Sequence, residues 1–91
     1  MKRTFLLGKL VATPAALAAC EANGKNPFKF IFRHAKGDWG DLSVEDIRAN
    51  ERAAEDGSRL LSAYHLRDGT KIWVITEADR SSTCILLPEE Y

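Results

Sequence analysis

The spacing of apolar and polar residues predicts three helices in the first two thirds of the chain. Each predicted helix begins at a residue whose side chain can cap a helix, and in the first two a proline follows the cap. Each ends near a glycine, which can adopt the left-handed conformation that terminates a helix. The predicted helices cover residues 14–23, 28–36 and 43–57.

The second and third predicted helices differ in how strongly one side is apolar. In the second, four residues recur at the spacing of a single helical face, so we expect that face to contact the core. The third has a thin apolar stripe interrupted by Asn50, which could face a neighbouring element or lie in solvent, and we expect this helix at the surface. The apolar residues of the second helix are Phe28, Ile31, Phe32 and Ala35, and its basic residues on the other side are Lys29, Arg33 and Lys36.

The residues after Gly57 change to the composition and period of β-strands. An Asp-Gly pair at residues 68–69 predicts a hairpin, and residues 78–82 form a second tight connection. The middle segment is apolar on both faces, which is typical of a central strand. The predicted strands cover residues 59–66, 71–77 and 83–87.

These elements predict an α+β fold in which about three N-terminal helices pack on a C-terminal antiparallel three-stranded β-meander. Ninety-one residues suffice for one hydrophobic core, so we expect a single domain over residues 1–91. Residues 5–13 are mostly apolar and could form an extra N-terminal strand or a packed arm, and the sequence leaves both open.

The first twenty residues resemble a bacterial lipoprotein export signal, but we expect them to belong to the folded domain. A basic start and an apolar stretch that ends at Cys20 fit such a signal. However, Lys9 splits the apolar stretch, and Thr13-Pro14 begins a predicted helix within it. No other segment approaches the ~20 apolar residues of a membrane span. We therefore expect a cytoplasmic protein with no membrane contact.

Charge is unevenly distributed along a chain whose formal net charge is +0. Residues 1–36 carry seven Lys or Arg and one acid (7 − 1 = +6), whereas residues 37–91 carry six Lys or Arg and twelve acids (6 − 12 = −6). The basic part could contact nucleic acid or an acidic protein. We expect instead that the two parts pack together and partly neutralise each other, because no basic run exceeds two residues. Cys20 and Cys84 have no metal-binding spacing and are expected to be small buried side chains.

The loop between the second and third predicted helices is the first candidate site. Two glycines bracket Asp38 and Trp39, in a loop that has no evident need for tryptophan. The loop could serve recognition or catalysis, with His34 as an acid or base and Asp38 or Asp41 orienting it. A metal site is poorly supported, because only one histidine is present. In the structural alternative, Trp39 fills the core, Asp41 or Ser43 caps the third helix, and His34 lies at the C-terminus of the second helix.

Polar residues of the predicted strands form a second candidate surface. Arg59 has no acid within two residues, so it could bind a ligand or be an ordinary solvated strand end. Asp79 and Arg80 are expected to lie in a turn and form a surface ion pair of little energetic value. The surface comprises Arg59, Ser62, Tyr64, His65, Thr76, Glu77, Asp79, Arg80, Ser81 and Thr83.

Several stretches in combination resemble a family of small phage- and plasmid-borne proteins. Its members are described as plasmid-related, and some carry the label of a type I restriction endonuclease subunit M. The resemblance implies a mobile-element context and supplies no biochemical activity, and 91 residues are too few for a methyltransferase. Cys84 departs from the family pattern, which has threonine there. The matching stretches are Val11-Ala12-Thr13-Pro14, His34-Ala35-x-Gly37-Asp38-Trp39-Gly40-Asp41-Leu42, Asn50, Gly57-Ser58-Arg59-Leu60-Leu61-Ser62-x-Tyr64, Ile72-Trp73-x-Ile75-Thr76-Glu77-x-Asp79-Arg80-Ser81 and Leu86-Leu87-Pro88-x-Glu90-Tyr91.

The predicted order of elements also resembles, in architecture alone, the barnase and RelE groups of small ribonucleases. This resemblance implies that Arg59 and Arg80 would hold the scissile phosphate and that His34 or His65 would transfer protons. The chain departs from the pattern, because it has no evident glutamate base beside the sheet arginine and lacks the positive net charge that RNA binding favours.

Two functional hypotheses follow from the sequence. In the first, the chain is a mobile-element accessory protein that binds another protein, without cofactor or metal, and could inhibit a host defence complex. Nucleic acid is the less favoured partner. The alternative is a ribonuclease toxin with His34, Arg59, His65 and Arg80 as catalytic residues. The residues expected to bind the protein partner are Asp38, Trp39, Asp41, Arg59, Tyr64, Asp79 and Arg80.

Overall fold

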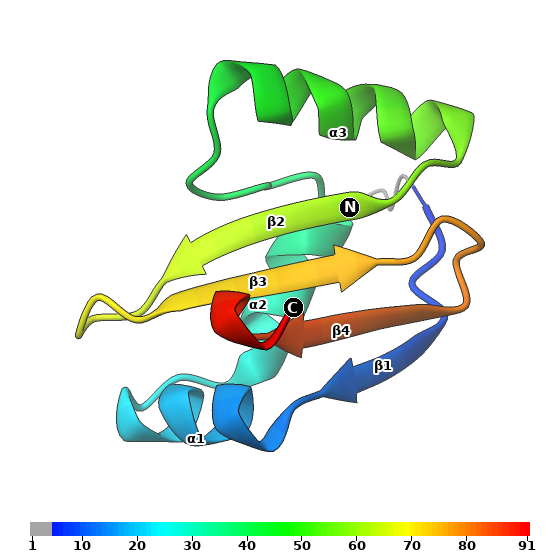
Figure 1. Cartoon of the computed structure of the whole chain (residues 1–91). Helices are drawn as coiled ribbons and strands as arrows, with labels where there is room; N and C mark the ends of the chain where they lie inside the picture. The colour runs from blue at the N-terminus through cyan, green and yellow to red at the C-terminus, as the bar shows by residue number, and fades with distance from the viewer. Residues whose placement is uncertain (1–4) are drawn as a thin grey trace.

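Four strands form one mixed sheet in the order β1-β4-β3-β2 in the computed structural model, which describes residues 5–91. Helix α2 lies behind this sheet, whereas α3 runs along the β2 edge and α1 lies near the β1 edge (Figure 1). In chain order the elements are β1 (Lys9–Ala12), α1 (Pro14–Ala22), α2 (Pro27–Ala35), α3 (Val44–Asp56), β2 (Leu60–His65), β3 (Lys71–Thr76), β4 (Ser82–Leu86) and a 3-10 turn, η1 (Pro88–Glu90).

The three helices begin and end where the capping residues predicted. The side chains of Thr13, Asn26 and Ser43 each accept a hydrogen bond from a main-chain N–H in the first turn of the helix that follows. At the end of α3, Gly57 adopts a left-handed φ of 84°, as its position in the sequence predicted. Local chemistry therefore accounts for all three helices.

The sheet has one strand more than the expected antiparallel three-stranded meander. Strands β2, β3 and β4 are antiparallel neighbours, as predicted. Strand β1 pairs with β4 in parallel, with Lys9 opposite Ser82 and Ala12 opposite Ile85. Residues 5–13, for which strand and arm were both open, thus supply an edge strand, and the sheet is four-stranded and mixed. The antiparallel meander is confirmed. The sequence left the fourth strand open because its pairing joins segments about seventy residues apart, which leaves no local pattern.

The expected core face of α2 is wrong in two of its four residues. Ile31 is buried, as expected, but the rings of Phe28 and Phe32 are 50% and 61% exposed. Phe30 and His34 are buried in their place. Phe30 lies on the opposite side of the nine-residue helix from Phe28 and Phe32, so the three rings cannot all face the sheet. The face that packs on the sheet carries Phe30, whose ring centroid lies 5.3 Å from that of Tyr64. The same face gives His34 two hydrogen-bond partners.

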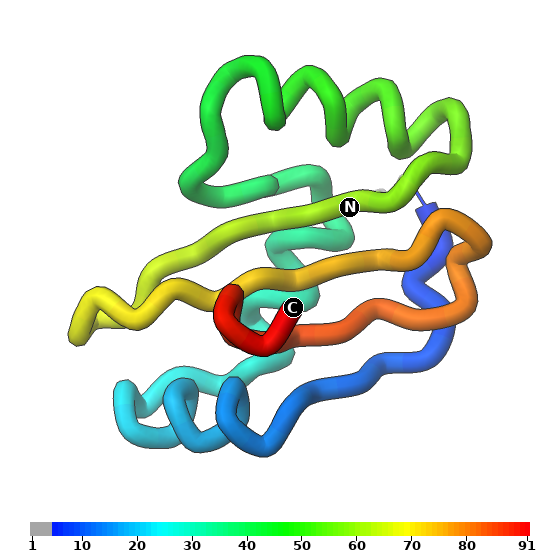
Figure 2. Tube along the Cα trace, in the orientation of Figure 1, coloured from blue at the N-terminus to red at the C-terminus, as the bar shows by residue number. Residues whose placement is uncertain are grey.

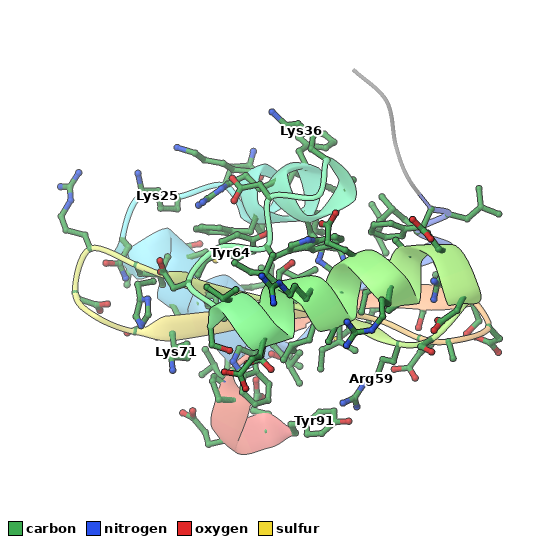
Figure 3. The ribbon with its side chains drawn as sticks, turned by 90° about the horizontal axis from the view of Figure 1, so that it is seen from above. Lys25, Lys36, Arg59, Tyr64, Lys71 and Tyr91 are labelled. Atoms are coloured by element: carbon green, nitrogen blue, oxygen red, sulfur yellow. The ribbon has the colours of Figure 1, made fainter. Side chains whose placement is uncertain are left out.

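The opposite face of the sheet is covered mainly by the C-terminal turn. Figure 3 shows Tyr91 and Arg59 on the side of the sheet away from Lys36 of α2. The Tyr91 ring lies edge-on to Trp73 of β3, with 5.9 Å between ring centroids. Both apolar faces of β3 are therefore covered, as expected for a central strand.

Residues 5–8 run beside the turn between β3 and β4, as the trace in Figure 2 shows. Within residues 5–91, no helix is long and apolar enough to cross a membrane. Cys20 is buried, as expected, and Cys84 is half-buried, and both are free thiols.

Candidate functional site

The loop after α2 buries its tryptophan. Trp39 is 4% exposed, and its indole N–H donates to the Glu51 carboxylate at 2.6 Å. The Phe5 ring stacks on it, with 6.1 Å between centroids. Trp39 therefore fills the core, as in the structural alternative drawn from the sequence, and is not available to anchor a partner.

The same loop closes the outer edge of β2. Trp39 and Asp41 exchange main-chain hydrogen bonds with Ala63 at 3.1 and 2.7 Å. Gly40 lies between them with φ of 78°, where any side chain would collide with the carbonyl oxygen of Ala63. Two residues earlier in β2, the Asn50 amide bonds both the N–H and the C=O of Leu61. These contacts satisfy an edge that would otherwise be free to pair with other chains.

Two carboxylates of the loop remain at the surface, each beside a basic group. Asp38 accepts from Arg33 at 2.7 Å, and this bond holds the pKa of Asp38 below its usual value. The Arg33 guanidinium also lies 4.5 Å from the centre of the Tyr64 ring. Asp41 lies 2.7 Å from Nδ1 of His65, and both are exposed. Asp41 therefore pairs with a histidine of β2, and the cap of α3 is Ser43.

His34 is the centre of a buried chain of hydrogen bonds across the sheet. Its Nδ1 contacts the Ser62 hydroxyl, and its Nε2 lies 2.9 Å from the Thr76 hydroxyl. That hydroxyl lies 2.7 Å from the Thr83 hydroxyl, which donates to the main-chain carbonyl of Leu7 at 2.7 Å. All three hydroxyl residues are buried.

The direction of this chain determines which ring nitrogen of His34 carries the proton. A carbonyl oxygen only accepts, so the Thr83 hydroxyl donates to the carbonyl of Leu7 and must accept from the Thr76 hydroxyl. Thr76 in turn must accept from His34, which places the proton on Nε2 and leaves Nδ1 to accept from Ser62. Burial lowers the pKa of His34 to about 4, so the ring is neutral near pH 7.

The polar groups of Tyr64 and Arg80 also form hydrogen bonds within the protein. The Tyr64 hydroxyl donates to the main-chain carbonyl of Asp38 at 2.6 Å, and burial raises the pKa of this phenol. The Arg80 guanidinium donates to the carbonyls of Ala53, Ser58, Glu77 and Ala78 at 2.7 to 3.3 Å. Arg80 thereby joins the end of α3 to the turn before β4. The expected ion pair with Asp79 is absent, because Asp79 instead accepts from the N–H of Ser81.

The residues named for a ribonuclease are not gathered into one site. His34 contacts the face of β2 that carries Ser62. Side chains alternate between the two faces of a strand, so His65, three residues after Ser62, lies on the other face. Arg59 lies over the ring of Tyr91, 5.0 Å from its centre. Among residues 5–91, no three His, Cys, Asp or Glu side chains are grouped to hold a metal ion.

The exposed phenylalanines of α2 form an aromatic pair on the surface. Phe28 and Phe32 stack with 6.3 Å between ring centroids and are bordered by basic side chains. In Figure 3 the Lys36 side chain projects outward from α2, away from the sheet. We call this area the α2 surface, and it comprises Asn26, Phe28, Lys29, Phe32, Arg33 and Lys36.

An apolar groove adjoins the α2 surface at Phe28. It holds about 140 Å³ and lies where β1, α1 and α2 meet. No charged side chain lines it. We call it the β1 groove, and it is lined by Leu10, Val11, Ala12, Leu17, Pro27, Phe28, Ile31 and Ile85.

The chain was compared with family models, curated proteins and solved structures, and none of them matches it. The α2 surface and the β1 groove are therefore interpreted from their own chemistry. Sequence reasoning did not identify either one, because it assigned Phe28 and Phe32 to the core. The available signal was the crowding of α2, whose apolar residues exceed what one helical face can bury.

Proposed function

We propose that this protein acts by binding another protein, and that the α2 surface docks on an acidic region of that partner. The observation that carries the proposal is the pair of stacked, half-exposed phenylalanines, Phe28 and Phe32, bordered by basic residues. Aromatic side chains together with arginine are enriched among the residues that dominate protein interfaces. The resemblance to mobile-element proteins extends the proposal to inhibition of a host defence complex.

The charge around the α2 surface favours an acidic partner. Residues 5–36 carry five Lys or Arg and one acid, a balance of 5 − 1 = +4. Of these five, Arg33 is the one that has an ion-pair partner within residues 5–91. Within residues 5–91, the expected neutralisation by the acidic half takes the form of one direct ion pair, between Arg33 and Asp38. The lysines remain available to attract a negatively charged surface.

The apolar groove beside the α2 surface favours a protein over a nucleic acid. Its lining offers hydrocarbon and no polar side chain, which suits an aliphatic side chain of a partner. A surface that binds single-stranded nucleic acid would combine exposed aromatic rings with a positively charged groove, whereas no charged side chain lines the groove beside these rings.

Replacing Phe28 and Phe32 with alanine tests the proposal. Fully burying one such side chain is worth about 1.5–3 kcal/mol, and each ring is about half exposed. Losing both should therefore weaken binding by about 2 kcal/mol, or roughly thirtyfold. The matched control is Val44→Ala, which removes a 63% exposed apolar side chain from α3.

The experiment begins with affinity capture by the wild-type protein and both variants, followed by mass spectrometry. A captured protein is then purified and titrated against each variant at two salt concentrations. The proposal predicts binding that weakens with salt, is about thirtyfold weaker in the double variant and is retained in Val44→Ala. Binding that survives the double variant, or binding of an oligonucleotide in place of a protein, would contradict it.

A further inference from the structure

We infer that the partner contributes an extended acidic peptide, which pairs with the free edge of β1 and inserts an apolar side chain into the β1 groove. The inference rests on the proposed function and specifies the form in which the partner is recognised.

The main chain of β1 has one paired side and one unpaired side. The N–H groups of Lys9 and Thr13 donate to β4 at 3.0 and 3.1 Å. In a parallel ladder the residues that face the partner alternate, so Leu10 and Ala12 direct their N–H and C=O groups outward. Within residues 5–91, these outward groups have no hydrogen-bond partner. The edge therefore presents a repeating template for a further strand.

The other edge of the sheet is closed at two of its positions. At β2 the outward groups of Leu61 are occupied by Asn50, and those of Ala63 by the loop that contains Gly40. Exposed edges are usually protected by charged side chains, proline or bulges. Strand β1 carries one charged residue at its start, Lys9, and then presents Leu10 and Val11, which are 43% and 41% exposed. A four-residue strand of this kind can pair with about three to five residues of an added strand.

The β1 groove provides the side-chain contact that such a strand would need. Leu10 and Ala12 line the groove and also carry the outward main-chain groups, so both features lie on the same residues. Leu17 and Phe28 form the opposite wall, from α1 and α2. A strand that pairs with β1 would thus direct alternate side chains toward this wall, where an aliphatic side chain fits.

Two lysines near the edge favour an acidic peptide over a second copy of this chain, and the Glu90 carboxylate at the end of β1 already accepts from the Thr13 hydroxyl at 2.7 Å. Lys9 begins β1, and Lys29 adjoins Phe28 on the α2 surface. Neither lysine has an ion-pair partner within residues 5–91. Two copies joined through β1 would bring these basic surfaces together, whereas Asp or Glu beside the apolar residues of a peptide would complement them.

The test uses a displayed library of random twelve-residue peptides, selected on the full wild-type chain. We expect the selected peptides to alternate apolar residues and to be flanked by Asp or Glu. A synthetic peptide of the selected sequence is then added to ¹⁵N-labelled protein, and amide hydrogen exchange is measured. Leu10 and Ala12 amides should exchange rapidly in the free protein and at least tenfold more slowly in the complex. The amides of Val11 and Thr13, which face β4, should be protected in both states.

Proline substitution separates the outward donor from the rest of the strand. Ala12→Pro removes an N–H that faces away from β4, and it should leave the fold intact while weakening peptide binding at least fivefold. Val11→Pro removes an N–H that faces β4 and should instead lower thermal stability. Val44→Ala is the control on α3 and should bind the peptide like wild type. If Ala12→Pro fails to fold, the hydrogen-exchange measurement on the unmodified chain still decides the question.

The outcomes distinguish this inference from the proposed function. If binding depends on Phe28 and Phe32 but leaves the exchange of the Leu10 and Ala12 amides unchanged, the proposed function stands and strand addition is overturned. Protection of those amides that grows with protein concentration alone would mean that a second copy occupies the edge, and would overturn the acidic peptide. Selection of no peptide, or binding of an oligonucleotide to the same residues, would overturn it as well.

Discussion

Mild acid should destabilise the fold through His34 before the carboxylates take up protons. Its pKa is about 4 in the folded protein, against an ordinary value of 6.5, because the ring is buried. The unfolded chain therefore binds a proton first as the pH falls. The stability that the neutral ring contributes is complete above about pH 6.5 and is lost progressively between pH 6.5 and pH 4.

The size of this effect follows from the difference between the two pKa values. A difference of about 2.5 units corresponds to at most about 3.4 kcal/mol. At pH 5, linkage gives a loss of about 2 kcal/mol relative to pH 7.5. Four surface carboxylates whose pKa lies below 3.8 add losses only at lower pH, namely Asp38, Asp56, Asp68 and Asp79.

Urea denaturation at pH 7.5 and pH 5.0 measures the effect directly. The wild-type chain should lose about 2 kcal/mol of unfolding free energy between these pH values. His34→Gln should be less stable at pH 7.5 but should lose little more on acidification. A wild-type loss below about 0.5 kcal/mol, or a loss of the same size in His34→Gln, would refute the burial of a neutral His34 as its cause.

Three further substitutions test the structural assignments. Asn50→Ala should lower the free energy of unfolding, measured with urea, by about 2–4 kcal/mol, because it leaves the N–H and C=O of Leu61 without partners. Light scattering should also show increased self-association of this variant through the β2 edge. Arg80→Ala should cost about 2 kcal/mol by calorimetry, because it removes the donors that bind the end of α3; full stability would show these bonds to be unimportant. Trp39→Phe should lower the free energy of unfolding by about 1 kcal/mol, because it removes the hydrogen bond to Glu51, and it should leave partner binding unchanged. Loss of binding in a stable variant would show that the loop takes part in the interface.

The helices and the hairpin could be predicted from the sequence because their determinants are local. Thr13 and Ser43 cap helices through hydrogen bonds that span three residues. Gly57 and Gly69 adopt left-handed conformations at a helix end and in a hairpin turn. Each of these signals acts within a few positions, so a single sequence contains all the information needed.

The parallel strand and the core face of α2 could not be predicted in the same way. Strand β1 forms because β4 lies beside it in space, and nothing near Lys9–Ala12 indicates that neighbour. The rotation of α2 depends on Ser62 and Thr76, which lie 28 and 42 residues from His34. These partners make it favourable to bury a histidine while phenylalanines remain exposed.

The candidate site was misplaced for a related physical reason. Trp39, Tyr64 and Arg80 belong to residue types that anchor interfaces, but the same large side chains also stabilise a small core. Here Trp39 and Tyr64 are buried, and Arg80 binds main-chain carbonyls. Residue type alone does not distinguish the two uses, whereas the exposure of Phe28 and Phe32 does.

The most direct test of the account is to map the interface in the complex of this chain with its purified protein partner. Amide and aromatic cross-saturation in solution would report which residues the partner covers. The account predicts strong effects on β1 and α2, at Leu10, Phe28 and Phe32, and none in the segment 38–41. An interface centred on that segment, with the α2 surface unaffected, would contradict it.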